Sequence, residues 1–309
     1  MTLITDEMRA AIGVESRPST HRVESSAIAR FNAAIGVRGQ DYRLATLVDR
    51  EGAIEAPPTF TRSFRPSPAP AEFEPPVDGV MDAGSEWKFL QAVLPGDEIT
   101  VTTQLVDLFE RTGRLGEVFF AVRENRFVNQ RGELAVLERD TEVYHTVGAV
   151  VGPRPAQRDL APAAPNPNGD GASAPSDAAD GDEPPVLECR PTLRQLVTYA
   201  AASGDFCELH YDSDLARERG FGDAIVYGAL KSAFLGRLIT DWIGEEATLR
   251  ELDVQYRAVD LRDAPLLCRG YVKGRRSEDG ATLLDLEVWI EDGHGNRTTP
   301  GGAVVQLGP

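Results

Sequence analysis

The chain has 309 residues, of which 41% are hydrophobic, and this is enough for two packed domains of ordinary size. Its net charge of −17 opposes binding to nucleic acid or to an anionic membrane, because phosphate-rich partners require clustered Lys and Arg. No run of about 18 apolar residues is present and the N-terminal residues lack a signal-peptide pattern, so we expect a cytoplasmic protein.

The cysteines and histidines give no sign of a metal site. Cys189, Cys207 and Cys268 show no Cys-x-x-Cys spacing, which argues against both a disulfide framework and a zinc site. Three histidines are isolated from any partner at ligand spacing, namely His21, His145 and His294. We therefore expect no metal ligands in this chain.

The first half of the chain predicts a sheet with a shortened central helix. Strict alternation predicts a strand at Ile99–Leu105, and a turn is expected at residues 129–133. Residues 56–60 stand where a central helix would begin, but several prolines follow, and proline disrupts a helix interior. They are Pro66, Pro68, Pro70, Pro75 and Pro76. The hypothesis is that this half has lost catalysis and its freed space forms an acyl-chain or bulky-group pocket for the catalytic residues of the other half.

Residues 152–185 contain Pro, Ala, Gly, Asp, Asn and Ser almost exclusively, without hydrophobic periodicity. Such a segment cannot bury enough apolar surface to offset its chain entropy. A disordered linker is therefore predicted at 151–185, between an N-terminal domain at 1–150 and a C-terminal domain at 186–309.

The second half carries the most informative stretch of the chain. Apolar residues at helical spacing predict a helix over residues 193–202, and Gly204 is placed to end it. Asp205 and His210 follow on a loop, five residues apart, where a carboxylate and an imidazole can share one water molecule. Capping and hydrogen bonding are the alternative roles of these two side chains.

A second helix is predicted downstream, in the apolar segment that runs from Ile225 to Trp242. The start of this helix offers backbone N–H groups without helical partners, and such groups can stabilise a developing oxyanion. Alternation then predicts a strand at Leu284–Ile290, and a turn at residues 291–296 leads to a last strand.

Residues 199–230 resemble the signature of the MaoC-like family, also called the hydratase 2 or R-specific enoyl-CoA hydratase family. That pattern runs S-G-D-x-N-P-[LIV]-H, then Gly-Phe, then I-V-H-G. The resemblance implies that Asp205 and His210 are the catalytic pair and that the amide of Gly228 belongs to the oxyanion hole. Cys207, Glu208 and Tyr227 replace the family's Asn, Pro and His, which changes the loop beside the pair but leaves the pair intact.

The two halves are versions of one design. Residues 30–37 parallel 199–205, with Val37 in place of the acid and Tyr42 in place of the base, and residues 87–97 parallel 254–263. The resemblance implies an α+β fold of two hotdog domains, each an antiparallel sheet wrapped around a central helix, paired as a pseudo-dimer within the chain. The N-terminal half resembles the degenerate, non-catalytic dehydratase-like half of fused MaoC proteins, and further association into a homodimer is compatible with this fold.

These observations predict a hydro-lyase that reversibly hydrates a trans-2-enoyl-CoA to the (R)-3-hydroxyacyl-CoA. The expected substrate contacts are Cys207, Tyr227, Arg257 and Lys273; the last two belong to a basic group that could meet coenzyme A, although Lys273 could equally solvate a hairpin. No cofactor is expected, because coenzyme A is part of the substrate. The alternatives are a non-catalytic acyl-thioester-binding protein or subunit and an acyl-CoA thioesterase, and the sequence leaves open which of Asp205 and His210 is the acid.

Overall fold

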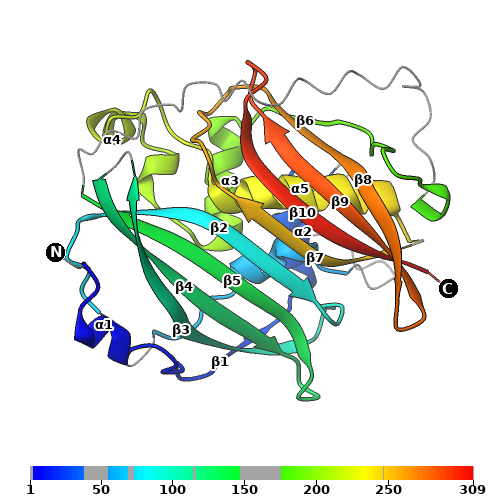
Figure 1. Cartoon of the computed structure of the whole chain (residues 1–309), viewed down its shortest axis with the longest axis horizontal. Helices are drawn as coiled ribbons and strands as arrows, with labels where there is room; N and C mark the ends of the chain where they lie inside the picture. Colours follow the sequence, from blue (N-terminus) through cyan, green and yellow to red (C-terminus); the bar gives the residue numbers. More distant parts are fainter. Residues whose placement is uncertain are drawn as a thin grey trace.

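The computed structural model describes residues 3–37, 55–68, 73–113, 116–146, 175–245 and 247–308. Their strands form one ten-stranded antiparallel sheet in the order β1-β3-β4-β5-β2-β7-β10-β9-β8-β6 (Figure 1). The first half supplies Ser19–Arg22 (β1), Gly79–Phe89 (β2), Glu98–Gly113 (β3), Gly116–Val128 (β4) and Leu134–His145 (β5). The second half supplies Leu187–Cys189 (β6), Ala247–Gln255 (β7), Leu266–Glu278 (β8), Ala281–Glu291 (β9) and Arg297–Leu307 (β10).

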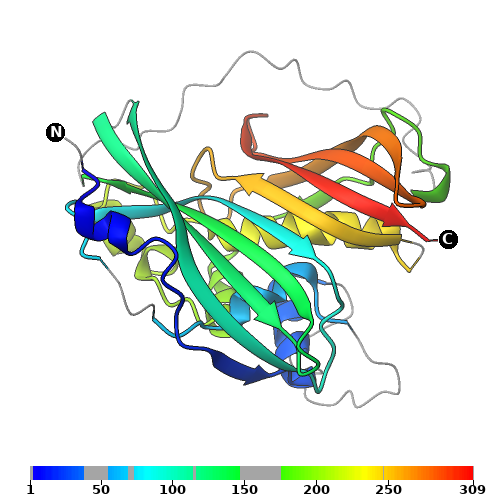
Figure 2. The ribbon, with the colours of Figure 1, turned by 60° about the horizontal axis from the view of Figure 1, so that its bottom comes forward.

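Both halves share one topology. The order β1-β3-β4-β5-β2 of the first half recurs as β6-β8-β9-β10-β7 in the second, and the halves join where β2 pairs with β7. Figure 2 shows the two curved sheets meeting at these strands. The predicted α+β class and the pairing of two hotdog units within one chain are therefore confirmed.

The helices lie between and beside these strands. They span Asp6–Ala10 (α1), Ser25–Ala34 (α2), Leu193–Ser203 (α3), Ser213–Glu218 (α4) and Gly228–Ile243 (α5), with 3-10 turns at Pro58–Ser63 (η1), Pro175–Asp177 (η2) and Glu208–His210 (η3). None of the described helices is long and apolar enough to cross a membrane.

Helix α5 is the central helix of the second half. Most of its residues are buried, as expected for a helix that is apolar on nearly every side, and it packs against β7, β8 and β9. In the corresponding place the described part of the first half has only the six-residue 3-10 helix η1, and residues 64–68 and 73–78 form no helix. The predicted shortening of the first central helix is therefore confirmed.

A pseudo-twofold axis relates the two halves. Glu86 of β2 lies opposite Asp253 of β7 at the centre of the paired stretch, so the axis passes between them. The axis relates residues that lie the same number of positions after Glu86 and Asp253. Phe89 and Tyr256 each lie three positions after these residues, so they are counterparts. This agrees with the parallel between residues 87–97 and 254–263 in the sequence.

The ends of α2 and α3 follow the same axis. Gly36 and Gly204 end these helices with similar left-handed backbone angles, φ of 78° and 72°. Only glycine adopts this conformation without a steric penalty. The next residue is Val37 in one half and Asp205 in the other, so the counterpart of the predicted acid is an apolar side chain.

The predicted linker falls mostly outside the described residues. Its last part, 175–185, is ordered and lies along the edge of the second half-sheet. The N–H of Gly181 donates to the carbonyl of Val272 at 2.8 Å, and the N–H of Val272 donates to Asp182 at 2.8 Å. Ala178 is 2% exposed. These bonds satisfy backbone groups of β8 beyond the short strand β6, which explains why residues of polar composition are fixed here.

Candidate active site

The predicted acid stands at a helix end, as the sequence indicated. Thr192 caps the start of α3, where its side chain accepts a hydrogen bond from Gln195, and Gly204 ends the helix. Asp205 follows, half-buried, and its Oδ1 accepts a bond from the N–H of Cys207 at 3.1 Å. The carboxylate is therefore held by its own loop rather than by an ion pair.

His210 is oriented by a backbone carbonyl. Turn η3 brings the imidazole back toward the start of α5, where Nδ1 lies 2.8 Å from the carbonyl oxygen of Ile225. Since a carbonyl only accepts, Nδ1 carries the hydrogen, and in the neutral ring Nε2 keeps a free lone pair. Burial lowers the pKa of His210, against the opposing effects of the Ile225 carbonyl and the Asp205 carboxylate. The neutral, basic form therefore prevails at pH 7.

Tyr227 supports both members of the pair. Its ring stacks on that of His210 with centroids 3.6 Å apart, and its hydroxyl donates to the backbone carbonyl of Asp205 at 3.1 Å. Only 1% of Tyr227 is exposed. The tyrosine that departs from the family signature is therefore a packing and orienting residue next to the pair.

The start of α5 lies beside this pair. Tyr227 is the N-cap residue and Gly228 the first helical residue, so the Gly228 amide has no partner within the helix. A Cβ at Gly228 would lie 3.0 Å from the ring of Tyr256, tighter than most Cβ contacts, so the ring would have to shift. Glycine at this position thus lets an aromatic ring approach the helix start, where a ligand oxygen would accept from the amide.

A polar network from both halves lies behind Gly228. The hydroxyl of Tyr256 lies 2.6 Å from Oγ of Ser232 and 3.1 Å from Oγ of Ser85. Ser85 in turn accepts from Arg62 of η1 at 2.7 Å, and Arg62 pairs with the buried Glu138 at 2.8 Å. Burial raises the pKa of Glu138 despite this positive neighbour.

Asp82 of β2 adds a negative group to the same region. Limited hydration raises its pKa to about 6, although the side chain keeps contact with solvent; the Arg62 guanidinium opposes this shift, and the carboxylates of Asp140, Glu142 and Asp205 add to it. Sequence reasoning did not find Asp82 or Arg62, since the pairing of β2 with β7 and the packing of η1 on α5 bring them here.

The other predicted contacts divide into two groups. Cys207 bonds to Asp205 through its backbone N–H and is exposed as a residue. Partial burial of its sulfur raises the pKa of the thiol, and a raised pKa leaves less of the nucleophilic thiolate. Arg257 is exposed and directly follows Tyr256. Lys273 lies elsewhere: it is exposed next to the buried Val272, on the face of the sheet opposite α5. The structure therefore separates Lys273 from the pair.

The fold and the site define a class of protein: a double hotdog with an Asp/His pair at the start of its one long central helix. Residues 180–277 match the model of the MaoC like domain, and residues 10–138 match the FAS1-like, dehydratase domain region. No curated protein sequence matches the chain.

Solved structures show the same double architecture. A MaoC-like dehydratase aligns with TM-score 0.73 and 17% identity over 97% of this chain and 99% of its own. A MaoC-like dehydratase from Phytophthora capsici aligns with TM-score 0.67 and 15% identity over 97% and 98%. A conserved hypothetical protein from Mycobacterium tuberculosis, described as a double hotdog fold, aligns with TM-score 0.59 and 12% identity over 94% and 96%.

The chain belongs to the fused MaoC-like type, with a dehydratase-like first half and a MaoC-like second half. This membership supports activity of the hydratase and dehydratase kind in general terms.

Proposed function

We propose that the protein is a hydro-lyase that adds water to a trans-2-enoyl-CoA and forms the (R)-3-hydroxyacyl-CoA, in a reversible reaction. The observation that carries the proposal is the fixed imidazole of His210: its Nδ1 is committed to Ile225, its Nε2 has no hydrogen-bond partner among the described residues, and the Asp205 carboxylate is close enough to act on its pKa. A base at His210 and a carboxylate next to it form the pair that can hold a single water molecule.

The proposed reaction follows from these positions. The Asp205 carboxylate accepts one O–H of the water, and Nε2 of His210 removes the other proton as oxygen attacks C3. The thioester oxygen gains negative charge and accepts a hydrogen bond from the Gly228 amide at the start of α5. His210 then returns the proton to C2, so that the water's H and OH add across the double bond. The reaction needs no separate cofactor.

The acyl group of the substrate is proposed to carry no free carboxylate in addition to its thioester. Asp82 and Asp205 already place negative charge in this region, and the Arg62 guanidinium is engaged by Asp140 and Glu138. An anionic tail would meet the like charges of Asp82 and Asp205. Neutral acyl groups are therefore the proposed substrates.

The test is the loss of ultraviolet absorbance of the conjugated enoyl thioester, measured with a short and a long trans-2-enoyl-CoA. Asp205→Asn and His210→Ala should each lower kcat at least about 10²-fold, the contribution expected of positioned acid and base groups. Asp214→Asn, an exposed carboxylate on α4, is the matched control and should keep wild-type turnover.

Three outcomes would contradict the proposal. Equal turnover in wild type and both variants would remove the pair from the mechanism. Release of free coenzyme A, detected with a thiol reagent, would indicate a thioesterase. Thioester binding without turnover in the wild type would indicate a binding protein, the alternative to which the substitutions at Cys207, Glu208 and Tyr227 point.

A further inference from the structure

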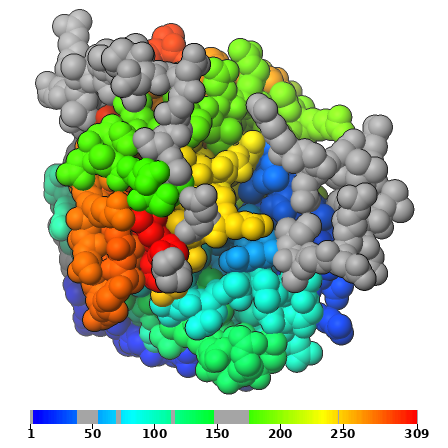
Figure 3. All heavy atoms as spheres, turned by 90° about the vertical axis from the view of Figure 1, so that its right-hand side faces the viewer, coloured from blue at the N-terminus to red at the C-terminus, as the bar shows by residue number. Residues whose placement is uncertain are grey.

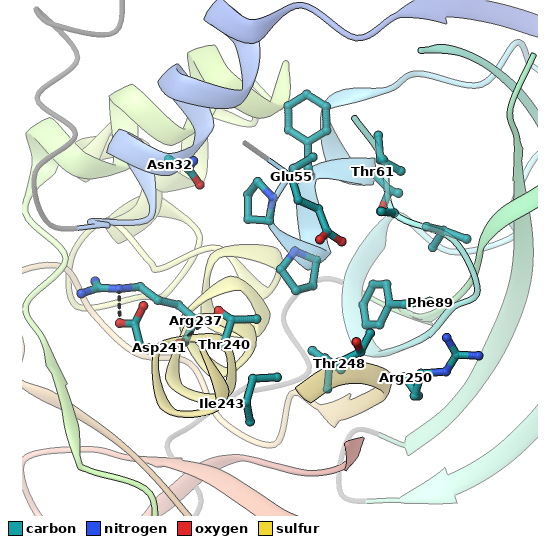
Figure 4. Close-up of a pocket in the computed structure, with 18 of the residues that line it drawn as sticks. Asn32, Glu55, Thr61, Phe89, Arg237, Thr240, Asp241, Ile243, Thr248 and Arg250 are labelled. Atoms are coloured by element: carbon teal, nitrogen blue, oxygen red, sulfur yellow. Dashed lines mark hydrogen bonds and ion pairs between the residues drawn. The ribbon is translucent and has the colours of Figure 1, made fainter. Parts of the chain in front are cut away.

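A second site of this molecule lies at the far end of α5. The structure has a cavity of about 540 Å³ near the C-terminal end of that helix, lined also by η1 and by the ends of β2 and β7. Figure 4 shows Thr240 and Ile243 of α5 and Phe89 of β2 around it. In Figure 3 this end of the molecule is built from yellow atoms of α5 and from blue and cyan atoms of the first half. Volumes of this size are typical of sites for small molecules.

This cavity is the pseudo-symmetric counterpart of the candidate active site. Val37, which lines it, is the counterpart of Asp205. Phe89, which also lines it, is the counterpart of Tyr256, the ring that touches Gly228. Three parts of one site therefore recur around the cavity: the helix-end residue, the aromatic of the central strand and the start of the central helix, here η1.

The counterpart has lost the chemistry of the active site. Valine supplies no carboxylate, and phenylalanine lacks the hydroxyl that joins Tyr256 to the polar network. Pro57 and Pro58 stand at the start of η1, and proline has no N–H to offer an oxyanion. Each change removes a polar function and leaves an apolar surface, while the volume is retained.

The cavity is separate from the Asp/His pair. Gly228 and Thr240 are twelve residues apart on α5, which corresponds to about 18 Å along the axis. Between them η1 packs on α5, and Pro58 lies within 3.8 Å of the position of a Cβ on Gly236. A ligand of moderate length bound at the pair does not reach the cavity by this route.

The lining selects an apolar ligand with a polar end. Apolar side chains such as Phe60, Val93 and Leu249 line the cavity together with polar ones, among them Asn32, Glu55 and Thr240. The Arg237 guanidinium is committed to Asp241 at 3.1 Å and to the carbonyl of Ile35 at 3.3 Å, so it is not free to bind an anion deep in the cavity. Half-buried Arg250 and exposed Thr248 on β7 supply polar atoms at the rim.

We propose that this cavity is a second, non-catalytic binding site for a saturated acyl chain. The inference rests on the proposed function for the kind of ligand, an acyl group. The cavity occupies the position that corresponds to the proposed acyl-thioester site and lacks the catalytic groups of that site. The inference does not depend on turnover at Asp205. A bound chain would bridge η1, β2 and α5, the elements at which the two halves meet.

The experiment measures binding stoichiometry by equilibrium dialysis with octanoyl-CoA, a saturated thioester that cannot be hydrated, and separately with octanoate. The wild type should bind two octanoyl groups per chain. Thr240→Phe, which fills the cavity from α5, should bind one and keep wild-type hydration activity. Thr198→Phe is the matched control, since Thr198 also bonds back to its own helix, α3, at an exposed site, and it should bind two.

The same binding measurements show which part of the ligand is recognised, and a second variant controls for misfolding. Competition by octanoate at the Thr240-sensitive site would show that the acyl chain alone suffices, and binding of octanoyl-CoA only would assign the thioester. Thr248→Trp fills the exposed rim without entering the core and should weaken the same site at least tenfold, which guards against misfolding of Thr240→Phe.

Two results would overturn the inference. One is a stoichiometry of two that persists in Thr240→Phe. The other is a single site in the wild type together with a KM that rises in Thr240→Phe, since the cavity would then hold the tail of the substrate. A Thr240-sensitive site in a protein without hydratase turnover would instead sink the proposed function and leave this inference standing.

Discussion

Gly36 and Gly204 end α2 and α3 with the same turn, yet the turn delivers Val37 in one half and Asp205 in the other. Downstream, η1 is a six-residue 3-10 helix preceded by Pro57 and begun by Pro58, whereas α5 continues for sixteen residues. The two halves therefore keep one backbone plan and differ in a few side chains and in the length of one helix. This difference teaches that one backbone plan can carry two different sites: the Asp205/His210 pair in one half and a cavity without that pair in the other.

The buried ion pairs offer the strongest way to sharpen this comparison. In the second half Lys231 of α5 pairs with Asp260 at 2.9 Å, and both side chains are at most 3% exposed. Lys231→Met leaves a buried carboxylate without its partner and should lower the free energy of unfolding by about 3–5 kcal/mol. Urea denaturation measures this change. The double variant Lys231→Met/Asp260→Leu is the control and should recover most of the loss.

The first half should respond differently to the same kind of change. Arg62→Met leaves Glu138, whose pKa is raised by burial, and a protonated carboxyl needs no cation. With Arg62 present the pKa of Glu138 is raised to about 8, and without Arg62 it rises further, so the carboxyl is neutral in both proteins at pH 5 to 7. The stability lost in Arg62→Met should therefore change little over that range and grow as pH rises past about 8, where only the wild-type carboxylate ionises beside its cation. A loss that shrinks above that pH would contradict the comparison.

The paired glycines test whether the turn serves stability, chemistry or both. Alanine in the left-handed region costs roughly 1–2 kcal/mol, so Gly36→Ala and Gly204→Ala should destabilise the protein to a similar degree. Only Gly204→Ala should also lower hydration turnover, because it displaces Asp205. Thermal unfolding and the absorbance assay measure the two effects. Equal loss of turnover in both variants would mean that the first half also takes part in the reaction.

Local patterns in the sequence predicted much of this site. The apolar spacing and Gly204 gave the end of α3, the apolar run gave α5, and the prolines after residue 60 gave the short η1. Each of these features depends on neighbours in the chain. The internal repeat also matched Phe89 with Tyr256, which the register of β2 and β7 bears out.

The remaining parts of the site depend on contacts across the sheet. Arg62 and Asp82 reach it through the packing of η1 on α5 and the pairing of β2 with β7, and no local pattern encodes either contact. The position of Lys273 was a different matter, because its signal was present. Buried residues alternate along β8 up to Val272, and Lys273, the extra residue of a β-bulge, lies on the outer face, where its charge acts on Asp253 and Glu287. Taking the basic group as a patch ignored this alternation.

The pH dependence of hydration tests the smallest of these differences, the burial of one imidazole. Burial lowers the pKa of His210 below its ordinary value of 6.5, so the base stays neutral to lower pH than a free imidazole does. The acid limb of kcat/KM should therefore have its midpoint below 6.5. Tyr227→Ala removes the ring that covers His210, and the charged form is then better hydrated, so the midpoint should move up toward 6.5. His294→Gln, a change in an exposed turn, should leave the limb in place; an unmoved limb in Tyr227→Ala would assign it to another group.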